Sequence, residues 1–217
     1  MLGVQPVVYV VDDDVSVRES LELLIRTEGW RAALFASAQD FLVYPREMVP
    51  SCLVLDVSLP GLDGLELQQR LANRVEIPII FITGHGDVPM SVRAMKAGAV
   101  EFLPKPFAVD VLLEAIRSAI DGSRGALEIE AGIRALRHHY ESLTARERDV
   151  MELVVAGLLN KQVGAELGIS EITVKAHRGQ VMRKMKADSL PELVLMAARL
   201  GLQSGTRTDR RSSRRSG

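Results

Sequence analysis

The first 120 residues alternate between two hydrophobic periods, and this alternation constrains the fold more than any other feature of the sequence. Short runs rich in β-branched residues, apolar at nearly every position, are typical of strands buried on both faces of a parallel sheet. These runs are residues 7–11, 31–35, 51–55, 77–82 and 100–103. Because stretches with helical spacing separate them, the pattern predicts an α/β domain with a doubly wound, five-stranded parallel sheet.

The intervening stretches are predicted to be helices that pack against this sheet. They cover residues 15–28, 37–44, 62–73, 88–97 and 109–120. In the fourth of them, Val88, Val92 and Met95 fall on one apolar stripe. The last carries a similar stripe that includes Val109. Such stripes are typical of helices that cover a core.

Charge separates the chain into two parts. The 217 residues have a net charge of −1, but residues 1–121 carry 10 basic and 17 acidic residues, and residues 144–217 carry 14 and 8. This asymmetry predicts two domains with different partners. With no apolar run long enough to span a membrane and no signal peptide at the start, we expect a cytoplasmic protein without a membrane partner. The chain has a single cysteine, Cys52, which excludes an internal disulfide and a multi-cysteine zinc site. Because Cys52 opens an apolar run, it is interpreted as a buried residue.

Polar side chains follow four of the predicted strands. Asp12 and Asp13 follow the first, Asp56 the third, Thr83 the fourth and Lys105 the fifth. Because the carboxyl ends of parallel strands share one edge of the sheet, these side chains are expected to meet where open α/β sheets bind ligands. Three carboxylates there would repel one another unless a cation intervened, and oxygen ligands without Cys or His favour Mg²⁺. A lysine and a hydroxyl beside them suit the transfer of a phosphoryl group.

Each of these residues also has a structural interpretation. The acids at 12–14 could cap a helix, and Asp56 and Thr83 could belong to turns. Lys105 and Pro106 could form an exposed connection. Their conjunction on one edge of one sheet favours the functional interpretation.

The stretches VVDDDVSVRESL, LVLDVSLPGLDGLEL, FITGHGD and AGAVEFLPKPF together resemble the receiver domain of two-component response regulators, which has a flavodoxin-like fold, over residues 7–120. The resemblance implies that a sensor histidine kinase phosphorylates Asp56. It implies that Asp13, Asp56 and the backbone carbonyl of Ser58 ligate Mg²⁺, with Asp12 assisting through water. Thr83 would donate a hydrogen bond to the phosphoryl group, and Lys105 would pair with it.

The same resemblance implies a switch. Phe102 falls where receivers keep a mobile aromatic residue, often Tyr, and Pro106 would follow a cis peptide bond. Phosphate on Asp56 would add a charge of roughly −1.5 to −2. The loop after the fourth strand would then move inward, Phe102 would follow, and the surface formed by the fourth helix, fifth strand and fifth helix would change.

Residues 122–143 are predicted to connect the two domains. Leu127, Ile133 and Leu136 have helical spacing, and the absence of proline favours a helix. GSRG at 122–125 is a plausible break, so a looser hinge is the alternative.

The remainder is predicted to be all-α. Thr144 and Glu147 have the spacing of a capping box. A short helix over 160–167, a turn at Gly168 and a longer helix to about Lys186 form a helix-turn-helix, and a fourth helix follows. The expected organisation is a receiver over 1–121, a linker over 122–143, a four-helix DNA-binding domain over 144–203 and a disordered basic tail over 204–217.

The longer helix has two different faces. Val174, Val181 and Met185 form a stripe expected to face the domain core. The opposite face holds small, basic and amide residues and no acid: Ile172, Lys175, Ala176, Gly179, Gln180 and Arg183. Small residues let a helix approach base edges, and basic or amide side chains read bases or anchor phosphates. Lys184 is also expected within reach of phosphates, and a helical packing module is the alternative.

Residues 143–196 resemble the DNA-binding domain of the LuxR/NarL class through LTARERDV, NKQVGAELGIS and ITVKAHR with MRKM, and the whole chain resembles the FixJ subgroup of transcriptional regulators. Gly164 stands where Ala is common in that class. The residues expected to contact DNA are Lys161, Thr173, Lys175, Ala176, His177, Arg178, Gly179, Gln180 and Arg183. The resemblance implies that Lys175, Ala176 and Gly179 approach bases. It also implies promoter DNA and RNA polymerase as partners, and a homodimer on DNA.

Three other functions fit the residues less well. An aspartyl-phosphate hydrolase needs a second Asp two residues after the nucleophile, where this chain has Ser58. A phosphorylation-independent scaffold conflicts with the intact set of acids, threonine and lysine, and an RNA-binding antiterminator conflicts with the helix-turn-helix. We therefore expect a phosphate acceptor and transcription regulator rather than an enzyme, self-dephosphorylation aside.

Overall fold

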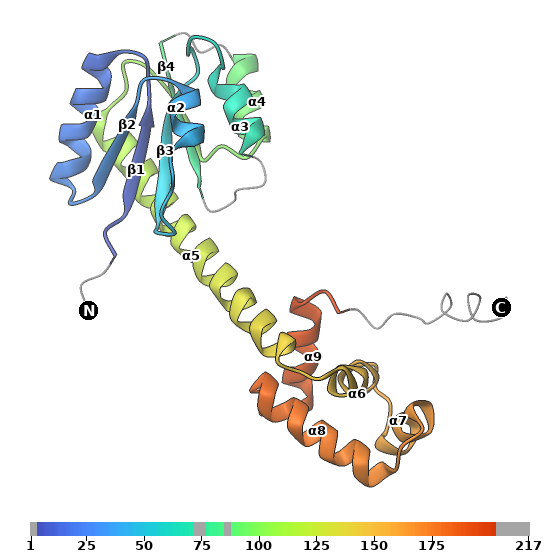
Figure 1. Cartoon of the computed structure of the whole chain (residues 1–217). Coiled ribbons are helices and arrows are strands. Elements are labelled where there is room, and N and C mark those ends of the chain that lie inside the picture. The colour runs from blue at the N-terminus through green and yellow to red at the C-terminus, as the bar shows by residue number, and fades with distance from the viewer. Residues whose placement is uncertain (1–3, 72–76, 85–87, 203–217) are drawn as a thin grey trace. The chain divides into compact units, whose positions relative to one another are not determined.

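The computed structural model describes residues 4–71, 77–84 and 88–202 (Figure 1). The chain divides into two compact units, Met1–Ile129 and Glu130–Gly217. The predicted basic tail lies outside the described residues.

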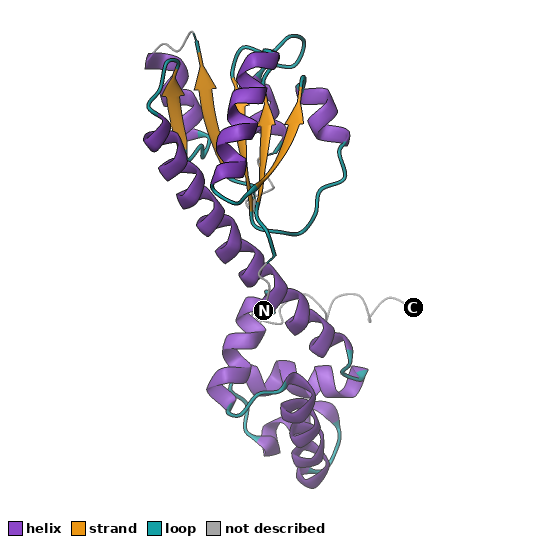
Figure 2. Cartoon of the chain, turned by 90° about the vertical axis from the view of Figure 1, so that its left-hand side faces the viewer, coloured by secondary structure: helices purple, strands orange, loops and turns teal. Residues whose placement is uncertain are grey.

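The first unit is a parallel sheet with helices on both faces (Figure 2). Its strands are β1 (Val7–Val11), β2 (Arg31–Phe35), β3 (Ser51–Asp56), β4 (Ile79–Thr83) and β5 (Glu101–Pro104). They lie in the order β2-β1-β3-β4-β5, and each neighbouring pair is parallel. Every residue of β1, β3 and β4 is buried, which explains why these runs are apolar at nearly every position. The predicted α/β fold is confirmed.

Two hydrophobic cores lie on the two faces of the sheet. The helices of this unit are α1 (Val15–Thr27), α2 (Ala38–Val43), α3 (Gly64–Arg70), α4 (Val88–Lys96) and α5 (Val109–Glu141). Alternate strand residues, such as Val8 and Cys52, pack with α1 and α5. The residues between them, such as Tyr9 and Leu53, pack with α2, α3 and α4. Cys52 is fully buried, as expected.

The apolar stripe predicted along α4 does not face the sheet. Val88 is 75% exposed, and Val92 and Met95 are each 44% exposed. Ala94 is buried instead, and Met90 packs partly against the same core. The prediction was wrong because a short helix can carry two apolar stripes. The stripe that faces the sheet includes Ala94, whose backbone carbonyl accepts a buried hydrogen bond from Gln68 Nε2 at 3.0 Å. On α5, Val109 is half exposed, at 50%, but Leu112, Leu113 and Ile116 of the same predicted stripe are buried.

Two helices differ in extent from the sequence pattern. α3 begins at Gly64 rather than at residue 62 because the Asp63 side chain accepts a hydrogen bond from Glu66 N–H and so caps the helix. Residues 72–73 of the predicted helix lie outside the described residues. α5 continues without a break through residues 122–125, where Ser123 is buried and its Oγ lies 3.1 Å from Ser51 N.

The described part of the second unit consists of the end of α5 and four further helices. These are α6 (Ala145–Val155), α7 (Asn160–Leu167), α8 (Glu171–Met185) and α9 (Leu190–Arg199). Both hydrogen bonds of the Thr144–Glu147 capping box are present, and Gly168 ends α7 in the left-handed region with φ of 65°. Leu136 of α5 packs in the core of this unit. Among the described residues, no helix combines the length and the apolar character needed to cross a membrane.

Candidate functional site

The carboxyl ends of β1 and β3 bring three acidic side chains together. Asp12, Asp13 and Asp56 each offer an oxygen atom, and these atoms lie within 4.8 Å of one another. Asp12 and Asp56 are buried, whereas Asp13 is exposed. The structural interpretation of the acidic run holds for the next residue, Asp14, whose side chain caps α1 by accepting a hydrogen bond from Ser16 N–H at 2.8 Å.

Lys105 connects two of these carboxylates. Its Nζ lies 2.7 Å from Asp12 Oδ2 and 3.0 Å from Asp56 Oδ2. Burial opposes the charge of Lys105, but the hydrogen bonds to both carboxylates outweigh burial and raise its pKa. Burial also raises the pKa of Asp12, and the hydrogen bond from Lys105 offsets only part of this effect. One ammonium therefore faces a cluster of three carboxyl groups.

The donor set fits a hard divalent cation. Three carboxylates face one lysine, and the cluster offers only oxygen atoms as ligands. Ser58, the source of the expected backbone ligand, lies beside the cluster, since its N–H donates to Asp56 Oδ1 at 3.1 Å. Asp13 is exposed, so a cation could reach the cluster from solvent. These residues are suited to Mg²⁺.

The other expected members of the site lie on the two adjacent strands. Thr83 is buried at the end of β4, and its backbone carbonyl accepts a hydrogen bond from Lys105 N–H at 2.7 Å. The peptide bond between Lys105 and Pro106 is cis. Phe102 is half-buried on β5, with its ring centroid 6.1 Å from that of Phe81. The strand that carries Phe102 therefore leads directly to Lys105.

Gly64 is a site residue that the sequence analysis missed. A Cβ atom at this position would lie 2.4 Å from the backbone oxygen of Asp56 and 2.9 Å from Val57 Cα. Its N–H also donates to Val57 O at 3.0 Å. Only glycine lets α3 begin this close to the end of β3. The available signal was a glycine directly after the capping residue Asp63, where helix formation alone does not require one.

Helix α8 presents the two faces that the sequence predicts. Val174, Val181 and Met185 are buried. Of the residues opposite them, Gln180 is half-buried, and the exposed ones are Ile172, Lys175, Ala176, Gly179 and Arg183. Thr173 is also exposed and shares a hydrogen bond of 2.8 Å with the Ser170 hydroxyl at the helix start. The exposed face thus combines basic and small residues without an acid.

The remaining expected DNA contacts differ in their surroundings. Lys161 is exposed on α7, and His177 is half-buried on α8. Arg178 is half-buried, and its Nη1 donates to Asn160 Oδ1 at 3.2 Å, which ties α8 to the start of α7. Gly164, on α7, could not carry a side chain in this arrangement because a Cβ would lie 2.7 Å from Ile169 O. This close approach explains why the chain departs from alanine there.

Lys184 has a different role from the phosphate contact expected of it. Its Nζ lies 2.7 Å from Glu147 Oε2 and 3.3 Å from Ser142 O. The Glu147 side chain is only 7% exposed. Burial opposes its charge, but hydrogen bonds from Lys184 and Thr144 outweigh burial and lower the pKa of Glu147. The pair therefore joins α8 to the capping box of α6.

We expect Glu147→Gln to lower the free energy of unfolding of the second unit by about 1–3 kcal/mol, because Lys184 loses its anionic partner. Since the folded-state pKa lies below the ordinary value of about 4.3, the ion pair contributes fully above that pH and is lost as the pH falls through the folded pKa. Hydrogen exchange of α6 and α8 peptides in the full chain measures the effect. The difference from wild type should shrink below about pH 4.

Glu152→Gln is the matched control, since Glu152 is an exposed acid on the same helix. Equal protection of α6 and α8 in the wild type and the Glu147 variant at neutral pH would contradict this role of the pair.

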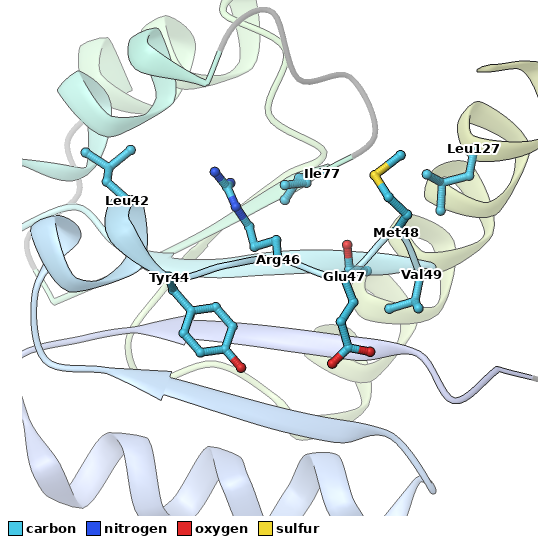
Figure 3. A pocket seen from close by; sticks show the side chains of 9 residues that line it. Leu42, Tyr44, Arg46, Glu47, Met48, Val49, Ile77 and Leu127 are labelled. Atoms are coloured by element: carbon cyan, nitrogen blue, oxygen red, sulfur yellow. The ribbon is translucent and has the colours of Figure 1, made fainter. Parts of the chain in front are cut away.

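A pocket of about 250 Å³ lies at the opposite edge of the sheet, near the amino ends of β3 and β4 (Figure 3). It is lined by Leu42, Tyr44, Arg46, Glu47, Met48, Val49, Ser51, Ile77 and Leu127. The Arg46 guanidinium lies over the Phe41 ring at 4.9 Å, and Glu47 forms an ion pair with Arg31 at 2.9 Å. No predicted site residue lines this pocket, so it is separate from the acidic cluster.

Two families match successive parts of the chain. The family described as the response regulator receiver domain matches residues 8–117. The family described as bacterial regulatory proteins, luxR family, matches residues 141–197. The first match contains the acidic cluster, and the second contains α8.

Relatives match nearly the whole chain. Nodulation protein W of Bradyrhizobium diazoefficiens is 51% identical over 199 residues, which cover 91% of this chain and 88% of that protein. The transcriptional regulatory protein FixJ of the same organism is 46% identical, with 90% of this chain and 96% of that protein covered. The structure of the response regulator StyR aligns with a TM-score of 0.78 at 46% identity, and the alignment covers 90% of this chain and 99% of StyR.

Proposed function

Because the chain belongs to the response regulators that join a receiver domain to a LuxR-type DNA-binding domain, we propose that phosphate on Asp56 controls how tightly its second unit binds promoter DNA. The phosphate donor is a sensor histidine kinase. The observation that carries the proposal is the position of Lys105, whose ammonium bridges Asp12 and Asp56 at the carboxyl ends of the strands.

Asp56 is the group that accepts the phosphoryl. One oxygen of its carboxylate forms a bond to phosphorus while the bond between phosphorus and the donor breaks. Asp13, Asp56 and the Ser58 carbonyl would hold Mg²⁺, with Asp12 assisting through water, and the ion would neutralise charge on the phosphoryl oxygens. Lys105, already 3.0 Å from Asp56, pairs with one of these oxygens.

The added phosphate competes with Asp12 for Lys105. The Thr83 hydroxyl donates a hydrogen bond to the phosphoryl group, and the Thr83 backbone carbonyl already accepts one from Lys105 N–H. A shift of these two residues reaches Phe102, which lies on β5 three positions before Lys105. Phosphorylation favours the state in which the loop after β4 has moved inward, because only in that state do Thr83 and Lys105 both contact the phosphate.

The surface that changes includes exposed apolar side chains on α4 and α5. Val92 and Met95 are each 44% exposed, and Val111 is 46% exposed. We propose that these side chains belong to the contact surface of a phosphate-dependent homodimer. A dimer would place two copies of α8 on half-sites about one helical turn of DNA apart. Action on promoter DNA places the protein in the cytoplasm, with RNA polymerase as a further partner.

Binding of the full chain to promoter DNA should tighten about tenfold after treatment with acetyl phosphate and Mg²⁺. A footprint on genomic fragments locates the site, and fluorescence anisotropy on that duplex measures the affinity. The affinity should fall steeply as salt is raised, because basic side chains release counterions from the phosphates.

The Asp56→Asn chain, treated in the same way, is the control and should not respond to the donor. Equal binding by treated and untreated wild-type chain would refute the regulatory part of the proposal.

A further inference from the structure

Ile172 is more exposed than any other large apolar residue that the structure describes in the second unit, at 82%. It is the second residue of α8 and belongs to neither hydrophobic cluster of this unit. A β-branched residue on an exposed helix is also a weaker helix former than alanine or lysine. Neither packing nor helix propensity therefore explains isoleucine at this position.

The helical position of Ile172 puts it on the proposed DNA face. At 3.6 residues per turn, Ile172 lies opposite the buried stripe that begins at Val174. Ala176, Gly179 and Arg183 follow it along the same line of the helix. The two small residues leave the apolar side chain uncovered.

The chemistry of the major groove offers one apolar partner. The N-terminal residues of a recognition helix reach base edges, and Ile172 lies in the first turn of α8. Base edges in this groove present hydrogen-bonding groups and, on thymine alone, a 5-methyl group. An isoleucine side chain can neither donate nor accept a hydrogen bond. The basic Lys175 and Arg183 on the same face supply charge complementary to DNA.

Building on the proposed DNA binding, we infer that Ile172 packs against the 5-methyl group of a thymine and thereby helps to determine which sequences the chain recognises. In this inference the side chain of Ile172 itself contacts the thymine methyl group. Lys175, Ala176 and Gly179 approach the bases that follow along the groove.

Substitution of thymine by uracil tests the inference, because uracil keeps every hydrogen bond of the base pair and lacks only the methyl group. The DNA site is first selected from a randomised duplex library with the full chain treated with acetyl phosphate. Each thymine of the selected duplex is then replaced singly by uracil, and the affinity is measured by fluorescence anisotropy. Wild-type chain should lose affinity about fourfold at one position in each half-site, as expected for one buried methyl group.

Variants assign the effect to the side chain. Ile172→Ala should bind the thymine and uracil duplexes equally, and Ile172→Val should keep part of the discrimination. Ile129→Ala is the matched control, since Ile129 is 68% exposed on α5, and it should discriminate like wild type. Because Ile172 is exposed, both of its variants should keep the thermal stability of the wild type.

Two outcomes overturn the inference and leave the proposed function intact: no uracil position weakens wild-type binding, or Ile172→Ala retains the full discrimination. If the library yields no enriched duplex even after phosphorylation, the proposed function fails, and the inference fails with it.

Discussion

Asp56→Asn should abolish the transfer of label from radiolabelled acetyl phosphate to the full chain. The asparagine amide has nearly the same shape, and its oxygen can still accept the hydrogen bond from Ser58 N–H, which wild type forms at 3.1 Å. It lacks the anionic oxygen that attacks phosphorus and that contributes to the oxygen ligands of Mg²⁺. We therefore expect labelling at background level, measured by gel autoradiography in the presence of Mg²⁺.

Asp110→Asn is the matched control, because Asp110 is an exposed acid in the first turn of α5 and should leave labelling unchanged. The first unit should stay folded in the Asp56 variant, since Lys105 keeps its ion pair with Asp12. Fluorescence of Trp30, the only tryptophan, reports its unfolding in urea. Undiminished labelling of a folded Asp56→Asn chain would show that another residue accepts the phosphate.

Gly179→Glu should weaken DNA binding about 100-fold, because like charges brought together at an interface cost several kcal/mol. Apart from its chain neighbours and the nearby backbone of α8, no atom lies within 4 Å of a Cβ at Gly179, so the longer side chain fits the folded unit and extends from the exposed face of α8. Its carboxylate would then meet DNA phosphates or base acceptors. Anisotropy with the selected duplex measures the loss.

Gly132→Glu provides the matched control, since Gly132 is an exposed helical glycine on α5 with equal space around its Cβ. It adds the same charge on a different helix and should leave the affinity unchanged. Gly179→Ala should stabilise α8 by about 0.5–1 kcal/mol. If Gly179→Glu binds DNA like the control, α8 does not approach DNA through this face.

The architecture of the first unit could be predicted because its signal is local. Strands buried on both faces need apolar residues at nearly every position, and β1, β3 and β4 have them. The predicted strands also gave the position of the acidic cluster, since side chains that directly follow parallel strands share one edge of the sheet. Asp12, Asp56 and Lys105 meet there, as expected.

The contacts that could not be predicted join segments far apart in the chain. Lys184 has the composition of a phosphate contact, yet it pairs with Glu147, 37 residues earlier. Gly64 has no motif of its own, and its importance depends on a backbone oxygen of another element only 2.4 Å from where its Cβ would be. Sequence spacing carries no information on such close approaches.

The sequence by itself determined the type of each element and the chemistry available at the sheet edge and on α8, because hydrophobic period and residue type act within a few residues. Only the tertiary structure decided which stripe of α4 faces the sheet. There the choice depended on how closely the backbone could approach, and Ala94, with a buried hydrogen bond from Gln68, allowed closer packing than Val92 or Met95. Packing selects among faces that a helix offers equally, and that selection exists only once the neighbouring elements are in place.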